Sequence, residues 1–301
     1  MKTKITALLL TFGLSWSFAQ SKSTDFTVTD LATQQITKLQ QLKSQTPQKR
    51  EKAFTEQLYT PHESLWKGYL GDAKSFASWM NETGYAKLNE WKKKDLNPEL
   101  LTRELYKHAQ KMQEFTGYQP VGKWYLIFGP AWTNLGGLST SEMLIDLASA
   151  INTSNERIIK LYPHELNHQI YKNTVPESPR LVLNRVLDEG FATYVSYLYH
   201  KKKYTPAEEL GYSEDQYQYC IDNELKIKDI LRRYYRDENE ETSRKLADRS
   251  HYIGENFPGA IGYFIGFRIV ENYVKIHGEN SWKDIYKMTP LEVLEKSQYL
   301  K

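Results

Sequence analysis

Cysteine is almost absent from this chain of 301 residues, which also lacks internal repeats, low-complexity tracts and a strong charge imbalance. Cys220 is the single copy, so an intramolecular disulfide and a cysteine-ligated zinc finger are both excluded. The formal net charge of +3 does not indicate nucleic acid or an anionic membrane as a partner. With 40% hydrophobic and 26% charged residues, the composition is that of a globular protein with a sizeable core.

A long hydrophobic run is also missing, since the apolar stretch at residues 5–14 is too short to span a membrane. It follows two lysines, and the small residues Ser17 and Ala19 stand at the −3 and −1 positions of a cut before Gln20. We therefore expect a signal peptide over residues 1–19, cleaved near Ala19, and an exported protein that is periplasmic or secreted. An uncleaved N-terminal anchor is the alternative.

Cleavage there would have two consequences for the mature chain. Two lysines leave with the signal peptide, so the net charge falls from +3 to +1. No cysteine follows the apolar run, and we expect neither a lipid anchor nor stable membrane insertion after cleavage.

The apolar pattern predicts an α+β protein that is mostly helical. Residues 20–115 predict a helical N-terminal region, whose first residues, 20–28, read as polar and flexible. Asn97 before Pro98 is typical of a helix start. Residues 116–301 carry the sheet and the remaining helices, and we expect them to form one integrated domain with what precedes them.

A small antiparallel or mixed sheet is expected between the two sets of helices. Strands are predicted at 124–128 and 142–147, with a turn that contains Gly136 and Gly137 between them. The strand 142–147, or the Gly136–Gly137 segment, is the candidate open edge on which an extended peptide could add as a strand. A plain structural hairpin is the alternative. Helices are expected after Ser154, from Ser178-Pro179 to residue 199, over 206–236 and 258–277, and from Thr289-Pro290.

The strongest chemical signal is the segment His164-Glu165-Leu166-Asn167-His168, which has the pattern H-E-x-x-H. On a helix, His164 and His168 lie on one face, where both imidazoles can reach one metal ion. Zn²⁺ suits imidazole and carboxylate ligands. Glu165 is rotated about 100° away, so it is placed to act as a general base. Pro163 leaves open whether the helix begins there or runs kinked from Ser154.

A catalytic zinc site usually has a third protein ligand and keeps its fourth position for water. Glu189 is the candidate, on a helix that follows His168 after a 20-residue spacer and folds back against the first helix. The small residues Gly190 and Ala192 would let the two helices approach closely. The predicted metal ligands are therefore His164, His168 and Glu189.

These motifs resemble the gluzincin pattern, in which H-E-x-x-H is followed by a Glu on the next helix. The run Glu189-Gly190-Phe191-Ala192 is similar to that of the large zinc aminopeptidases. Their spacer is two residues shorter, and their Gly-x-Met-Glu-Asn motif is absent here. The chain also resembles a bacterial family of predicted zinc-dependent proteases of otherwise unknown function, which has a late Gly-Tyr-x-x-Gly helix matched by residues 262–266.

The resemblance implies a zincin-like fold for residues 116–301 and roles for several residues. His164, His168 and Glu189 would bind zinc, and Glu165 would be the catalytic base. Thermolysin-like enzymes place an Asp four residues after the third ligand to orient a His. That position is Thr193 here, and Asp188 is the candidate for the orienting role.

An oxyanion stabiliser is the remaining requirement, because a tetrahedral intermediate needs a donor besides the metal. Tyr or His is usual in this clan, and Tyr263 is the first candidate, with His251 or Tyr252 as the second. With 22 tyrosines in the chain, a core tyrosine at position 263 is the alternative. Glycines 259, 262 and 266 are frequent for a helix, which predicts close packing against the zinc helices.

The sequence thus predicts an exported zinc-dependent hydrolase, with a peptide or protein as substrate. Two other functions stay open: a zinc hydrolase that acts on a non-peptide substrate, and a non-catalytic binding or scaffold protein stabilised by zinc. An exported helical scaffold without metal is a third. The remaining histidines, at positions 62, 108, 200 and 277, are expected to have structural rather than ligating roles.

Overall fold

The computed structural model describes residues 25–69, 71–129, 133–139, 141–253 and 256–301. The expected signal peptide, residues 1–19, lies outside the described residues. None of the described helices combines the length and the apolar character needed to cross a membrane.

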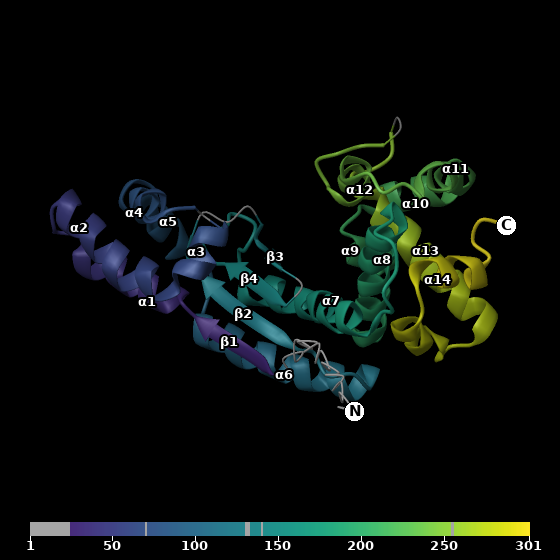
Figure 1. Ribbon diagram of the computed structural model, residues 1–301, viewed down its shortest axis with the longest axis horizontal. Helices are drawn as coiled ribbons and strands as arrows, with labels where there is room; N and C mark the ends of the chain where they lie inside the picture. The colour runs from purple at the N-terminus through teal and green to yellow at the C-terminus, as the bar shows by residue number, and fades with distance from the viewer. Residues whose placement is uncertain (1–24, 70, 130–132, 140, 254–255) are drawn as a thin grey trace, which may run out of the picture.

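The protein is α+β and mostly helical, with one small mixed sheet, as predicted (Figure 1). The sheet has four strands in the order β1-β2-β4-β3. The pairs β1/β2 and β2/β4 are parallel, and β3/β4 is antiparallel. The strands are β1 (Phe26–Asp30), β2 (Gly122–Ile127), β3 (Leu135–Gly137) and β4 (Glu142–Asp146).

The prediction that residues 20–28 are flexible is wrong for residues 26–28, which belong to strand β1. Phe26 and Val28 alternate with Thr27 and Thr29, a short period-2 pattern of residues that favour strands. This strand pairs with β2 from Phe26 opposite Gly122 to Asp30 opposite Leu126. The N-terminal region is therefore not purely helical, because it supplies one edge of the sheet.

The open edge expected at 142–147 is also wrong. Strand β4 lies between β2 and β3, so both of its edges are hydrogen-bonded along the described register. The outer strand on this side is β3, in which Gly136 faces Leu144 and Gly137 faces Met143. Of the two segments considered, Gly136–Gly137 is the one at an edge.

In the chain, the helices of residues 32–116 lie between β1 and β2, and the remaining helices follow β4. The helices of residues 32–91 lie at one end of the molecule and those of residues 182–297 at the other, and the helix of residues 155–174 runs between them (Figure 1). The buried apolar side chains form one continuous core. The helices are α1 (Ala32–Leu42), α2 (Pro47–Phe54), η1 (Thr55–Tyr59), η2 (Thr60–His62), α3 (Glu63–Tyr69), α4 (Ala73–Glu82), α5 (Gly84–Trp91), α6 (Pro98–Thr116), α7 (Asn155–Thr174), α8 (Val182–Tyr199), α9 (Pro206–Leu210), α10 (Glu214–Asp222), α11 (Glu224–Tyr234), α12 (Glu240–Ala247), α13 (Ile261–His277), η3 (Ser281–Lys287) and α14 (Pro290–Ser297).

Capping residues set several of these boundaries. The Asn97 side chain accepts a hydrogen bond from the N–H of Leu100 at the start of α6, as expected. The helix expected from Ser178 begins later, at Val182, since Leu181 is still extended. The helix expected over 206–236 is three helices, because Gly211 has a left-handed backbone that ends α9 and Asn223 separates α10 from α11.

Candidate metal centre

Helix α7 presents the two histidines. It begins at Asn155, where the side chain of Ser154 accepts a hydrogen bond from the N–H of Arg157, and it continues through Pro163. This settles the alternative left by the sequence, since the helix starts at the serine cap and not at the proline. His164 and His168 are one turn apart, and their Nε2 atoms lie 3.1 Å from each other.

Helix α8 brings Glu189 to the same point. Glu189 Oε2 lies 3.4 Å from Nε2 of His164 and 3.2 Å from Nε2 of His168. The three atoms thus form a nearly equilateral triangle with sides of 3.1, 3.2 and 3.4 Å. Zinc bound at about 2.0–2.1 Å in a tetrahedron separates its ligands by about 3.3–3.4 Å. The predicted ligand set therefore has the spacing of one face of a zinc tetrahedron.

The surroundings of this triangle also fit a cation. Glu189 Oε2 is buried and faces Nε2 of His164 and Nε2 of His168. Burial alone would raise the pKa of Glu189, but the adjacent His168 and His164 outweigh it and hold that pKa well below its usual range. Burial would lower the pKa of His168, and the charges of Asp188 and Glu189 instead raise it. Positive charge is thus favoured here, whether a proton or a metal ion supplies it.

Asp188 fixes the orientation of His168, the role considered for it from the sequence. Its Oδ1 lies 2.7 Å from Nδ1 of His168, and Lys172 Nζ lies 3.9 Å from its Oδ2. With Nδ1–H donated to this carboxylate, the Nε2 lone pair of His168 faces the ligand triangle. Thr193, which occupies the position used by thermolysin-like enzymes, instead donates its hydroxyl to the backbone carbonyl of Glu189.

Glu165 lies beside the ligand cluster and does not belong to it. Burial raises the pKa of Glu165, while the charges of His164 and His168 lower it less strongly. A carboxylate with a raised pKa accepts and releases a proton more readily near neutral pH. The side chains of His164 and Glu189 are 14% and 15% exposed, so solvent reaches this part of the site.

Helix α13 places Tyr263 over the centre. Its ring is parallel to that of His164, with an interplanar angle of 3° and centroids 6.0 Å apart. Burial, followed by the charges of Glu189 and Glu165, raises the pKa of Tyr263, so the phenol stays protonated and can donate a hydrogen bond. Of the other candidates, Tyr252 is 65% exposed, and His251 Nδ1 lies 3.2 Å from Asp248 Oδ2.

Glycines let α8 and α13 approach each other. A Cβ added at Gly190 would lie 2.1 Å from the carbonyl carbon of Gly266, and one added at Gly266 would lie 2.0 Å from the carbonyl oxygen of Val186. The expected close packing against the zinc helices is confirmed for Gly266. Gly262 meets the backbone of Leu246 on α12 more closely, at 2.8 Å, than Val186 of α8, at 3.3 Å. The expectation is wrong for Gly259, whose added Cβ would meet the backbone of Arg249. Gly190 was expected to let α8 approach the histidine helix α7. This prediction is wrong, because the backbone next to Gly190 belongs to Gly266 and Phe267 of α13.

Two of the histidines outside the centre pair with other residues. His200 Nδ1 lies 2.7 Å from Glu209 Oε1, and His108 Nδ1 lies 3.0 Å from the hydroxyl of Tyr199. Sequence reasoning missed Arg249, whose guanidinium carbon lies 5.4 Å from the centroid of the Tyr263 ring. No local pattern marks this arginine, since its position depends on how three helices pack.

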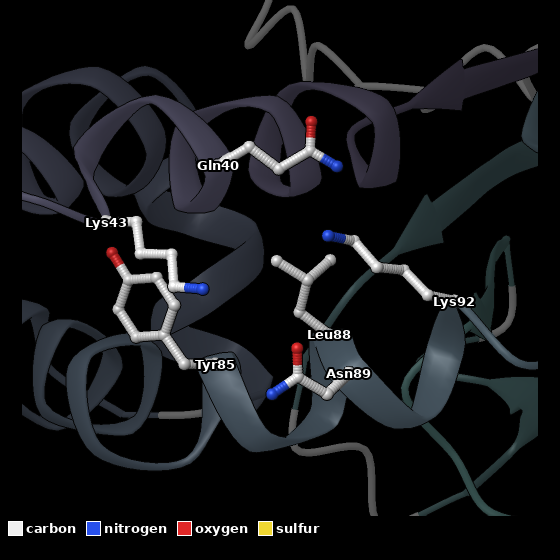
Figure 2. Close-up of a pocket in the computed structure, with 6 residues that line it drawn as sticks. All are labelled: Gln40, Lys43, Tyr85, Leu88, Asn89 and Lys92. Carbon is white, nitrogen blue, oxygen red and sulfur yellow. The ribbon is translucent and has the colours of Figure 1, made fainter.

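A hollow of about 140 Å³ lies apart from these residues, between α1 and α5 (Figure 2). Lys43 and Lys92 line it together with Gln40, Tyr85, Leu88 and Asn89, and the ammonium groups of the two lysines extend into the space between the helices. Both lysines stand at the C-terminal caps of their helices, where a positive charge offsets the carbonyl ends of the helix. Their presence needs no ligand, so we place the chemistry at the metal centre.

Comparison with known proteins adds one match. The model of a family described as gliding motility protein GldB matches residues 150–301, which is half of the chain. This range contains α7, α8 and α13, and therefore every residue of the metal centre. No curated protein and no solved structure matches.

Proposed function

The chain belongs to the family of gliding motility protein GldB, and we propose that it is an exported zinc-dependent hydrolase whose substrate is a peptide or protein. The observation that carries this proposal is the triangle of His164, His168 and Glu189, with sides of 3.1–3.4 Å. Its spacing, its buried carboxylate oxygen and its preference for positive charge all favour zinc.

In this proposal, the three ligands hold the metal and Asp188 keeps His168 in the ligating tautomer. A bound zinc ion supplies Lewis acidity, which lowers the pKa of a water molecule and polarises a carbonyl group. The described residues offer three ligand atoms, which leaves a position for water and substrate, as catalytic sites require. Structural zinc sites are usually closed by four protein ligands, so this count favours catalysis over a purely stabilising metal.

Glu165 is the proposed base, which takes a proton from the attacking water and passes it to the leaving amine. Its partly buried position beside the ligands supports this role, because burial raises its pKa toward the range useful for proton transfer. Tyr263 is proposed to donate its phenolic hydrogen to the oxygen of the attacked carbonyl, where negative charge develops. Its protonated state and its stacking on His164 support this placement.

The resemblance to gluzincins supports a peptide substrate and a zincin-like arrangement of residues 116–301. An extended peptide would add to the outer strand β3 at Gly136–Gly137, where the backbone edge is not covered by another strand of the sheet. This part of the proposal concerns binding and is independent of the metal ligands.

Export is the cellular setting proposed. The signal pattern of residues 1–19 supports it, and cleavage near Ala19 would release the mature chain. The family name implies a part in gliding motility, which we propose for this chain as well. The single cysteine, Cys220, is buried in α10, so lipid attachment at a cysteine near the cleavage site is not proposed.

The test combines metal analysis with two matched variants on α7. Purified mature protein should contain one zinc per chain, and it should cleave members of a peptide library read by mass spectrometry. Glu165→Gln should keep the zinc and lose turnover by a factor of about 100 or more. Glu156 is exposed in the first turn of the same helix, so Glu156→Gln should retain both the bound zinc and the turnover of the wild-type protein.

Each other outcome has a definite meaning. Absence of zinc, together with an unchanged melting curve in EDTA, would refute the metal centre. Zinc without cleavage of any peptide, and Glu165→Gln without effect, would favour the non-catalytic binding protein. Cleavage of ester or amide probes but of no peptide would retain the hydrolase and refute the substrate class.

A further inference from the structure

Arg249 is an exposed cation at the border of the metal centre, and no aspartate or glutamate within the described ranges pairs with it. Its Nη2 donates to the carbonyl of Leu210 at 2.8 Å, and its Nη1 approaches the carbonyl of Gly211 at 3.5 Å. A guanidinium has five N–H donors, so these two contacts leave most of its donors available. An arginine that has no carboxylate partner among the described residues, and that lies beside a proposed active site, is a candidate for binding a ligand.

The fold makes room for this side chain from two directions. A Cβ added at Gly211 would lie 3.0 Å from Nη2 of Arg249, and one added at Gly259 would lie 2.0 Å from its backbone oxygen. Gly211 also has a left-handed backbone, with φ of +67°, which carries the chain past the guanidinium. Arg249 is therefore positioned at its guanidinium, by the carbonyls of Leu210 and Gly211, and at its backbone, which packs against Gly259.

The position lies within reach of a substrate bound at the metal centre. The guanidinium carbon is 5.4 Å from the centroid of Tyr263, which is 6.0 Å from that of His164. The guanidinium carbon of Arg249 and the centroid of the His164 ring are therefore at most about 11 Å apart. An extended peptide rises about 3.3 Å per residue, so 11 Å corresponds to about three residues.

We propose that Arg249 determines specificity by binding a carboxylate of the substrate, within about three residues of the cleaved bond. This inference rests on the proposed peptidase function. The guanidinium fork matches a carboxylate in shape and charge, which a neutral amide or an ammonium group does not. The carboxylate would belong either to an Asp or Glu side chain or to the C-terminus of the peptide.

A purely structural role makes a different prediction. Arg249 bonds the carbonyls at the end of α9, so a structural arginine would support the loop that precedes α13 and nothing more. Its loss would then lower the melting temperature without changing which peptides are cleaved. Substrate preference therefore separates the two roles, whereas overall activity does not.

The experiment profiles cleavage of one peptide library, prepared with free and with amidated C-termini, by the zinc-loaded protein and its variants. The wild-type protein should favour acidic residues within three positions of the cut, or cut near a free C-terminus only. Arg249→Gln should lose this preference and raise KM for the favoured peptides about 10- to 100-fold, with kcat nearly unchanged. Arg249→Lys should keep part of the preference, and Arg249→Glu should shift it toward basic peptides.

Arg244→Gln is the matched control, because Arg244 is exposed on α12 and pairs with Glu240. Its profile should equal that of the wild type. An unchanged profile in Arg249→Gln and Arg249→Glu would overturn the carboxylate assignment and leave the peptidase intact. If the wild-type protein cleaves no peptide in the library, the proposed function fails and the assignment of Arg249 falls with it.

Discussion

The contact between α8 and α13 makes Gly190→Ala the sharpest test of the site architecture. In an ordinary helix this change stabilises by about 1 kcal/mol. Here the new Cβ would lie 2.1 Å from the carbonyl carbon of Gly266 and 2.2 Å from the backbone nitrogen of Phe267. Backbone atoms cannot rotate away as a side chain can, so the two helices must separate by more than about 1 Å.

The cost of this separation exceeds the gain in helix propensity. Overpacking of a well-packed interior destabilises by about 1–3 kcal/mol, and a backbone clash belongs at the upper end. After the gain of about 1 kcal/mol, we expect Gly190→Ala to lower the free energy of unfolding by about 2 kcal/mol. In a chain of this size, the melting temperature should fall by about 4 °C or more.

Urea unfolding followed by circular dichroism measures this effect, with Gly84→Ala as the control. Gly84 is also helical, as the first residue of α5, but its added Cβ would meet side chains and no backbone: Leu39 at 3.3 Å and Trp79 at 3.7 Å. The control should stay within about 1 kcal/mol of the wild type. Equal stability of the two variants would refute the close approach of α8 and α13.

Gly190→Ala should also lower the catalytic rate, because Gly190 follows Glu189 on α8 and the helix that it packs against, α13, carries Tyr263. A displacement of about 1 Å at a catalytic group costs about 100-fold in rate. We therefore expect Gly190→Ala to reduce turnover far more than its stability loss explains at 25 °C, while most of the zinc is retained. Full activity in a folded variant would remove Tyr263 from the proposed mechanism.

Three further predictions concern individual side chains. Asp188→Asn should weaken zinc binding about 10- to 100-fold in chelator competition, since it loosens the tautomer and orientation of His168; unchanged affinity would mean that the 2.7 Å contact has no such effect. Burial lowers the pKa of His108 to about 4, so between pH 6.5 and pH 4 the unfolded chain binds a proton that the folded chain does not. The free energy of unfolding of metal-free protein should therefore fall by about 2 kcal/mol on acidification through this window, with no contribution above it, and His108→Gln should remove that part of the slope in urea titrations. Tyr263→Phe should lower kcat about 100- to 1000-fold and Tyr252→Phe should leave it unchanged; equal rates in steady-state assays would contradict the assignment.

Local patterns predicted the cluster of His164, His168 and Glu189 because its geometry is largely local. The spacing of His164 and His168 is set by one helical turn, and Asp188 and Glu189 share the next helix. The sequence did not determine how α8 is rotated about its axis, and therefore which of its residues face α7 and which face α13, because this depends on packing. Gly190 illustrates this, since its small size indicated a close approach but not the helix that makes it.

Other features depend on contacts between distant segments. The interior place of β4 is a property of strand order, which no single strand encodes. Strand β1 had a local signal in Phe26 and Val28, but its short alternation was outweighed by the polar residues before it. Arg249 had no signal at all, because its neighbours Gly211 and Tyr263 come from separate helices.

The contacts of Asp188 and Glu189 with His168 have a consequence for how a metal ion would bind and dissociate. Two consecutive residues of α8 face its two nitrogens, with Asp188 at Nδ1 and Glu189 at Nε2. The contact with Asp188 does not involve the metal position, so it keeps α7 and α8 in register when no ion is bound. Uptake of zinc would then require no rearrangement of these helices, and its rate would be governed by loss of water from the ion and of a proton from the site.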